Sequence, residues 1–234
     1  VAPPVVNGST TSNFEAVGML MLCDGSYCDS FCSGTLIQKD WVLTAAHCVE
    51  ALDEYARYGY DGYFAVGADM NSITDYAEAT DWREHPQYSG TNGSTIENDI
   101  GLIELGSSLT SVDPMPLNEQ SASGWVGDEL TYVGYGITSD NANDSGIKRY
   151  AEMPIVQVDS QFIFSLDTRD DQNLCSGDSG GAALEPVGGS YELAGVNSYV
   201  FAYESRNSVC VGGGAAVARV DKYVSWIEQY VDLE

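Results

Sequence analysis

Residues 173–182, NLCSGDSGGA, place one serine, Ser179, between an aspartate and a pair of glycines. Glycine, serine and aspartate all form turns, so an ordinary surface loop accepts these residues. Glycines also lack a Cβ atom, which allows the backbone to come very close to a group held at Ser179. Other parts of the chain are needed to distinguish a surface turn from a functional hydroxyl.

Two further stretches carry residues that complement this serine. LTAAHCVE (residues 43–50) contains His47, and ENDIGLIEL (residues 97–105) contains Asp99. Taken singly, His47 is explained as a buried core histidine, Asp99 as a strand cap and Ser179 as a turn residue. A serine hydroxyl is a weak nucleophile that needs an adjacent base, and a carboxylate orients that base. Together the three residues indicate nucleophilic catalysis.

In the order His47, Asp99, Ser179, these motifs resemble the chymotrypsin/trypsin family of serine peptidases, and the order separates them from subtilisins and α/β-hydrolases. TAAHC together with GDSGG is a highly specific pair. The similarity covers nearly the whole chain, through VVNG (5–8), FCSGTLI (31–37), REHPQY (83–88), VGYG (133–136), NSYV (197–200) and VDKYVSWIEQ (220–229). The resemblance implies an all-β fold of two six-stranded antiparallel β-barrels with a C-terminal α-helix, and an active site in the cleft between the barrels.

The local sequence pattern agrees with an all-β chain. Short runs rich in Val, Ile, Leu and Tyr alternate with turn residues, which favours barrels or a sandwich. We expect strands at residues 17–22, 41–46, 62–67, 100–105, 129–136 and 191–201, and a helix only at residues 219–231. We assign residues 1–4 to a residual propeptide or N-terminal extension, 5–112 to the N-terminal barrel, and 113–234 to the C-terminal barrel and terminal helix.

The resemblance assigns a role to each residue of the motifs. His47 would accept the proton of Ser179, and Asp99 would hold the other ring N–H of the histidine. The backbone N–H groups of Gly177 and Ser179 would form the oxyanion hole, an arrangement worth on the order of 3 kcal/mol per donor. Ser198 matches the serine that supports the catalytic aspartate; the alternative is that it is an ordinary strand serine.

Four residues are expected to shape the specificity pocket. Asn173 stands where trypsin-like members carry an aspartate, so the main signal for a basic substrate residue is absent. Leu174 and Val200 narrow the pocket, and Tyr199 stands in place of the family's usual tryptophan. A branched side chain at the pocket mouth resembles elastase-type members and predicts a small or medium apolar residue before the scissile bond. An alternative is an endopeptidase with basic-residue specificity, in which Glu204 swings in to accept a lysine or arginine.

The N-terminal segment predicts a zymogen or a zymogen-like form. In the family, a newly freed amine at the position of Val5 pairs with the aspartate before the nucleophile, here Asp178. In this chain Val5 follows VAPP, and no Lys or Arg precedes it. We expect a precursor; the alternative is that Asp178 finds another partner.

Six cysteines suggest disulfides, because an even count is typical of exported proteins. A zinc module fits poorly, since His47 and Cys48 are adjacent and no second close Cys–His pair exists. The resemblance pairs Cys32 with Cys48 and Cys175 with Cys210, which leaves Cys23 and Cys28 to form a local bridge by arithmetic alone. We expect no metal or other cofactor, and no calcium in the loop after residues 64–67, which lacks the family's acidic residue.

The charge limits the possible partners. Nine Lys and Arg against 35 Asp and Glu give a net charge of −26, which argues against nucleic acid and anionic membranes. No apolar run approaches the length of a membrane span. Because the chain opens with VAPPVVNGST and has no signal peptide, we expect a processed product. Sequons occur at Asn7, Asn92 and Asn143.

These observations predict a secreted (extracellular or periplasmic), monomeric serine endopeptidase. Its expected partners are protein or peptide substrates, an activating protease and protein inhibitors. The alternative from another class is a non-catalytic peptidase homologue that acts as a binding protein. Such homologues usually lose a triad residue or the GDSGG glycines, and this chain keeps all of them.

Overall fold

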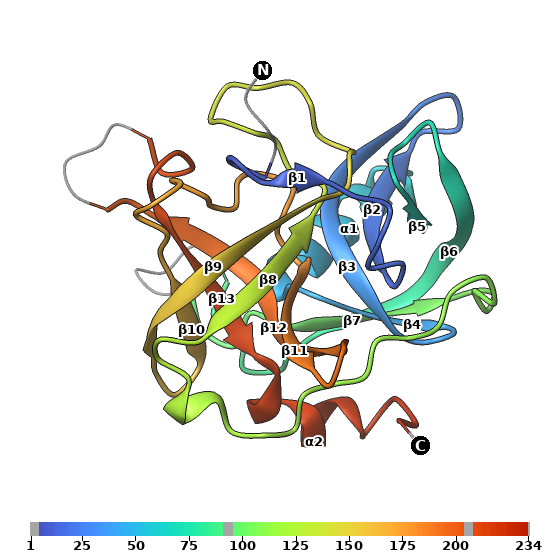
Figure 1. The fold of residues 1–234 in the computed structure, drawn as a ribbon. Helices are drawn as coiled ribbons and strands as arrows, with labels where there is room; N and C mark the ends of the chain where they lie inside the picture. Colours follow the sequence, from blue (N-terminus) through green and yellow to red (C-terminus); the bar gives the residue numbers. More distant parts are fainter. Residues whose placement is uncertain (1–4, 91–95, 204–207, 234) are drawn as a thin grey trace.

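A computed structural model describes residues 5–90, 96–203 and 208–233 (Figure 1). The expectations for residues 1–4, Asn92 and Glu204 therefore lie outside the described residues. The strands are β1 (Ser9–Thr10), β2 (Val17–Cys23), β3 (Cys28–Gln38), β4 (Trp41–Thr44), β5 (Asp61–Gly67), β6 (Ile73–Glu84), β7 (Gly101–Leu105), β8 (Glu129–Gly134), β9 (Arg149–Val158), β10 (Phe162–Ser165), β11 (Ala182–Val187), β12 (Ser190–Phe201) and β13 (Gly214–Arg219). The helices are α1 (Ala46–Arg57), α2 (Val224–Ile227) and two 3₁₀ turns, η1 (Ala122–Gly124) and η2 (Val220–Lys222).

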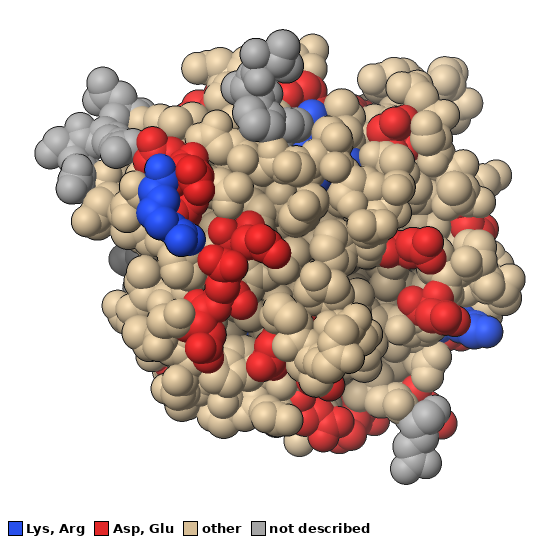
Figure 2. Space-filling view, in the orientation of Figure 1, with Lys and Arg blue, Asp and Glu red and all other residues tan. Residues whose placement is uncertain are grey.

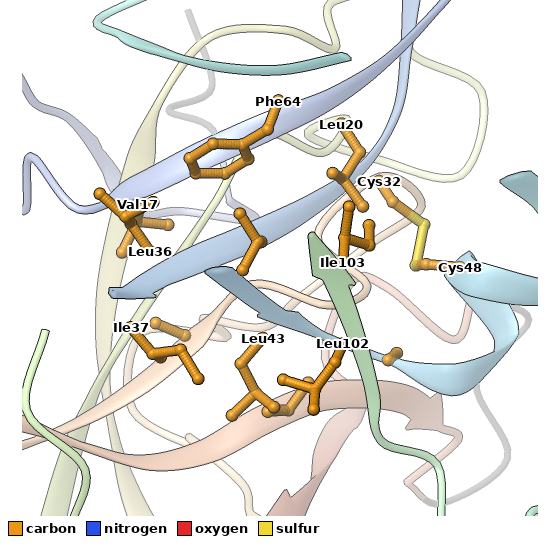
Figure 3. Close-up of a cluster of buried hydrophobic side chains, with 14 of the residues drawn as sticks. Val17, Leu20, Cys32, Leu36, Ile37, Leu43, Cys48, Phe64, Leu102 and Ile103 are labelled. Carbon is orange, nitrogen blue, oxygen red and sulfur yellow. A yellow bond between two sulfur atoms is a disulfide. The ribbon is translucent and has the colours of Figure 1, made fainter. Parts of the chain in front are cut away.

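The first barrel closes in the order β2-β3-β4-β7-β6-β5, with antiparallel neighbours throughout. Its interior is filled by apolar side chains from facing strands, among them Leu36, Leu43, Phe64 and Leu102, each fully buried (Figure 3). Burying one such side chain contributes roughly 1.5–3 kcal/mol, and closure leaves no strand edge unpaired. The barrel is thus a rigid base for the segments at its rim.

The second barrel is built from β8 to β13. These strands follow the order β9-β10-β13-β12-β11-β8, and an additional β9–β8 pairing closes the ring. Small residues line its interior beside larger ones, including Tyr132, Ala183 and Val217. The predicted architecture of two six-stranded antiparallel barrels is confirmed.

The helices differ from the sequence prediction in two ways. The terminal helix expected at residues 219–231 is reduced to η2 and the short α2, because Arg219 still belongs to β13 and the last residues form turns. The expectation that only the C-terminus is helical is also wrong. Helix α1 begins at Ala46, the last residue of the strand expected at 41–46, and it buries Ala46, Val49 and Leu52 on one side.

Each terminal segment of the described chain contacts the barrel formed by the other half of the sequence. Strand β1 pairs with β9, with Ser9 opposite Tyr150, so the N-terminal segment lies on the second barrel. At the other end, Trp226 packs its ring 5.0 Å from that of His85, which follows β6 of the first barrel. The two terminal segments therefore connect the barrels. The boundary at residues 112 and 113 remains a prediction.

The surface carries the excess of acid. Acidic side chains are scattered over the face shown in Figure 2, with few basic ones among them. Some acids are directly opposed: Glu185 on β11 faces Glu192 on β12. Among the described residues, no helix has the length and hydropathy required to span a membrane.

Candidate active site

Asp99 is a fully buried carboxylate that joins the two barrels. Its Oδ1 accepts the backbone N–H of His47 at 2.9 Å, and its Oδ2 lies 2.7 Å from the Nδ1 atom of the same histidine. From β12 in the second barrel, Ser198 donates its hydroxyl to Oδ2 at 2.5 Å. The carboxylate therefore fixes the orientation of the His47 ring and is itself held by Ser198.

The residue before Asp99 is in a special backbone conformation. Asn98 has φ = 52°, a left-handed value that asparagine tolerates better than most residues. Its side chain donates to the carbonyl of Gln87 at 3.0 Å, and its backbone N–H donates to Oε1 of Gln161 at 2.9 Å. Tyr223 donates its hydroxyl to Oδ1 of Asn98 at 3.2 Å. Both barrels thus fix the backbone that presents Asp99.

His47 is presented by the first turn of α1. Strand β4 leads directly into this helix, and the disulfide between Cys32 and Cys48 attaches the helix to β3 beside the histidine (Figure 3). The side chain of His47 is 21% exposed, so its ring remains accessible. Ligand atoms of Cys32, His47 and Cys48 lie within 4.8 Å of one another, but both sulfur atoms are used by the disulfide and do not offer thiolates to a metal.

The loop carrying Ser179 packs directly on the strand that leads to His47. A Cβ atom on Gly180 would lie 2.0 Å from Oγ1 of Thr44 and 3.2 Å from the backbone nitrogen of Ala45. The carbonyl of Ser179 accepts the N–H of Ser33 at 2.8 Å. Because Thr44 and Ala45 come immediately before α1, this packing places Ser179 at the His47 side of the interface between the barrels.

Gly177 and Ser179 have free backbone donors. Gly177 has φ = 95°, which glycine adopts without strain. Within the described residues, neither the N–H of Gly177 nor that of Ser179 donates a hydrogen bond. Ser33 fixes this loop from β3, because its hydroxyl donates to the carbonyl of Gly177 at 2.8 Å and accepts the N–H of Tyr135 at 3.1 Å. The two free amides are therefore available to an anionic oxygen.

A pocket of about 270 Å³ opens beside Ser179. Its lining includes three of the four predicted specificity residues, and the full set is Leu174, Cys175, Ser176, Ser179, Asn197, Ser198, Tyr199 and Val200. The disulfide between Cys175 and Cys210 supports the wall. No charged side chain lines the pocket among the described residues.

Asn173, expected at the base of the pocket, is fully buried and is not part of this lining. Its Nδ2 donates to the carbonyls of Val209 and Cys210, each at 3.0 Å, and its backbone N–H donates to the carbonyl of Val6 at 3.2 Å. The residue therefore connects the segment behind the pocket to the N-terminal segment.

Asp178 is also buried, one residue before Ser179. Its carboxylate accepts the N–H of Gly136 at 2.8 Å and that of Cys175 at 2.9 Å. Burial raises the pKa of Asp178 to about 6, although both hydrogen bonds and the charge of Arg149 act in the opposite direction. Val5 is fully buried in the core of the second barrel, and the structure contains no described ion pair between it and Asp178.

Sequence reasoning did not identify Ser33, Ser176 or Arg149. Ser33 lies within FCSGTLI, but its contact with Gly177 spans 144 positions and leaves no local signal. The third disulfide, between Cys23 and Cys28, closes the hairpin of β2 and β3. All six cysteines are therefore paired as expected, and none is free.

Residues 6–227 match the family model described as Trypsin. The chain belongs to the trypsin family. It is 27% identical to brachyurin of Leptuca pugilator over 85% of this chain and 86% of that protein. It is also 27% identical to trypsin of Sus scrofa over 97% of this chain and 95% of that protein. With these relatives, the family identifies the chain as a serine endopeptidase.

Two other comparisons concern the length of a relative and the fold. The trypsin-family chain is 26% identical to vitamin K-dependent protein C of Mus musculus over 98% of its length, but it spans only about half, 52%, of that longer protein. Among solved structures it is similar to neuropsin, a serine protease expressed in the limbic system of mouse brain, with a TM-score of 0.76 and 21% identity. That alignment covers 97% of this chain and 100% of neuropsin and supports the barrel fold.

Proposed function

We propose that this trypsin-family enzyme hydrolyses peptide bonds with Ser179 as nucleophile, His47 as general base and Asp99 as the group that orients the histidine. The observation that carries the proposal is the double contact of Asp99 with His47, at 2.9 Å and 2.7 Å, beside the loop of Ser179. With Nδ1–H donated to the carboxylate, Nε2 is the ring atom free to accept the proton of Ser179.

The reaction proceeds in two halves. Ser179 Oγ attacks the scissile carbonyl as its proton passes to His47, and His47 then protonates the leaving amine to give an acyl-enzyme. A water molecule attacks the acyl-enzyme by the same route and releases the second product. The amides of Gly177 and Ser179, which donate to no other group in the described part of the chain, stabilise the oxyanion in each half.

We further propose an elastase-like preference for a small or medium apolar residue before the scissile bond. The uncharged lining of the pocket supports this preference, and the half-buried Val200 narrows the entrance. A basic side chain in this pocket would lose its hydration without gaining an ion partner.

We propose that removal of residues 1–4 activates the enzyme by freeing the amine of Val5. Two features support this step. Val5 is buried in the same hydrophobic cluster of the second barrel as Leu174, which lines the pocket. Val5 also has φ = 41°, a left-handed conformation that costs a β-branched residue about 1–2 kcal/mol. An N-terminal residue has no φ torsion, so cleavage before Val5 removes this strain.

The proposed location is outside the cytoplasm, and the proposed substrates are proteins or peptides, acted on by a monomer. Three disulfides support secretion, because reducing compartments rarely maintain them. An activating protease and protein inhibitors complete the proposed partners.

A fluorophosphonate probe tests the proposed chemistry. We expect covalent labelling of wild type at Ser179, loss of labelling in Ser179→Ala, and persistence in Ser176→Ala, which removes a neighbouring hydroxyl from the same pocket. Turnover in Ser179→Ala should fall by roughly 10⁴-fold or more, as in other serine peptidases. Retention of substantial turnover in Ser179→Ala would exclude the proposed mechanism.

A further inference from the structure

The carboxylate of Asp178 is held by hydrogen bonds alone. Both of its oxygens accept backbone N–H groups, and within the described residues no lysine or arginine nitrogen lies within 4.0 Å of it. A buried carboxylate is costly unless a cation lies nearby, and the cost is expressed here as a raised pKa. The loop that carries Ser179 therefore contains a buried negative charge, on Asp178, that a nearby cation would stabilise.

A buried arginine lies on the other side of Gly136. The guanidinium of Arg149, at the start of β9, is 2% exposed. Its Nη1 donates to the carbonyl of Gly136 at 2.7 Å and to the carbonyl of Asp144 at 2.8 Å. Gly136 thus binds Arg149 through its carbonyl and Asp178 through its N–H, which connects the cation to the carboxylate through a single residue.

Steric contacts keep the carboxylate in this position. A Cβ atom on Gly136 would lie 2.6 Å from Cγ of Asp178, and one on Gly134 would lie 2.2 Å from its Oδ1. Only backbone fits around the carboxylate at these points. Asp178 is therefore enclosed by the same segment that Arg149 binds.

The neighbouring cation, Lys148, does not stabilise the charge of Asp178. Lys148 is 1% exposed, and its Nζ donates to the carbonyls of Asn13 at 3.3 Å and Phe14 at 3.1 Å. Burial lowers the pKa of Lys148 to about 8, so this lysine loses its charge far more readily than a guanidinium. Asp144 is the ion-pair partner of Arg149, with Oδ2 3.5 Å from Nη2. Its charge raises the pKa of Asp178, whereas the charge of Arg149 lowers it.

We propose that Arg149 is a positioning residue that supports the charge of Asp178 through Gly136, and so keeps the loop of Gly177 and Ser179 in its catalytic conformation before Val5 is freed. This inference rests on the proposed function. It assigns basal activity to the chain that still carries residues 1–4. The amine of Val5 then adds a second cation and increases the activity further.

The test compares two N-termini in wild type, Arg149→Gln and Arg149→Lys. Each protein is prepared with the chain starting at Val1 and at Val5, and kcat and KM are measured with a small peptide substrate. We expect Arg149→Gln to lower kcat at least tenfold in the Val1 form, with a smaller change in KM, and only a few-fold in the Val5 form. Arg149→Lys should recover only part of kcat, because it restores a cation but not both carbonyl contacts of the guanidinium.

Arg57→Gln is the matched control, since Arg57 is exposed and pairs with Asp53 on α1 far from the loop. It should change neither form. Equal losses of kcat in both forms of Arg149→Gln would assign Arg149 a general structural role and overturn the proposal. Where Arg149→Gln does not fold, wild type alone decides: a Val1 form that the fluorophosphonate does not label overturns the proposal.

Labelling of the wild-type Val5 form distinguishes failure of the proposed role of Arg149 from failure of the proposed peptidase function. If the Val5 form is labelled and the Val1 form is not, the role of Arg149 fails and the proposed function stands. If neither form is labelled, the proposed function fails as well.

Discussion

Oγ1 of Thr44 lies 2.0 Å from the position that a Cβ atom on Gly180 would occupy. Thr44 ends β4 of the first barrel, and Gly180 follows the nucleophile in the second. The carbonyl oxygen of Ser33 lies 2.3 Å from the same position. The missing side chain of Gly180 therefore allows the loop of Ser179 to approach the segment that carries His47, and the proposed catalysis requires this contact between the barrels.

Gly180→Ala should destabilise the protein and disturb the site. The new methyl group overlaps Thr44 and Ser33, and Gly180 has φ = 79°, which alanine adopts with strain. Together these effects should lower the free energy of unfolding by about 2–5 kcal/mol and reduce kcat. Gly188→Ala is the control, because Gly188 also has a positive φ, 57°, and a Cβ atom added there would have no neighbouring atom within 4 Å. Equal losses of stability in urea unfolding would show that the contact with Thr44 does not matter.

Ser198→Ala should lower kcat and leave KM nearly unchanged. Asp99 would lose the hydroxyl donor at 2.5 Å and keep its two contacts with His47. A hydrogen bond to a charged group contributes about 1.5–3 kcal/mol, so a loss of about tenfold or more in kcat is expected. Ser165→Ala is the control, since it removes a buried hydroxyl bonded to Tyr132 in the second barrel and should affect stability only. An unchanged kcat in Ser198→Ala would identify Ser198 as an ordinary strand residue.

Stability should depend on pH through Asp178. Burial raises the pKa of this carboxyl from 3.8 to about 6 in the folded protein. The folded protein therefore binds a proton at Asp178 more tightly than the unfolded chain does. This proton binding stabilises the folded protein fully below pH 3.8, and the stabilisation is lost as the pH rises through 6. Between pH 7 and pH 5 the free energy of unfolding of wild type, relative to Asp178→Asn, should increase by about 1 kcal/mol. A constant or decreasing difference in urea unfolding would show that Asp178 is ionised throughout this range.

The strands were predictable because each is a local apolar run between turn residues. The arrangement of two barrels was predictable only because the His47 and Ser179 motifs are specific to one family. Helix α1 (Ala46–Arg57) was not predicted, and the strand expected at residues 41–46 ends at Thr44. Ala46, Val49 and Leu52 are spaced as one buried helical face, and this signal was available. At the C-terminus Val220, Tyr223, Val224, Ile227 and Tyr230 share one face of an ideal helix. Val220, Tyr223 and Ile227 are buried, but Val224 is only half-buried and Tyr230 is 39% exposed, because α2 ends at Ile227.

The candidate site was predictable only where a motif carried it. His47, Asp99 and Ser179 lie within characteristic stretches, whereas Ser33 acts on Gly177 across 144 positions. The position of Asn173 depends on contacts with Val209 and Cys210 that no local pattern encodes. Long-range hydrogen bonds of this kind follow from the completed fold, so sequence spacing alone does not reveal them.

Val200→Gly should shift the substrate preference toward phenylalanine. Val200 is opposite Ala215 in the pairing of β12 with β13, and it lines the pocket of about 270 Å³ together with Leu174. In wild type, we expect alanine, valine, leucine or methionine before the scissile bond to exceed phenylalanine and tyrosine. One methylene changes the free energy by only about 1–3 kcal/mol in such a pocket, so the preference should be graded.

The measurement is kcat/KM for a panel of peptides that differ only at the residue before the scissile bond. Val126→Gly is the control, because Val126 is 59% exposed in a loop and its removal should not alter the ranking. Arginine exceeding alanine and valine in wild type would contradict the elastase-like proposal and favour recognition of a basic residue. In that case Glu204→Gln, at a position outside the described residues, should abolish the preference for arginine. If the apolar pocket is correct, Glu204→Gln should leave the ranking unchanged and Val200→Gly should invert it, because only the pocket volume then determines which side chain enters.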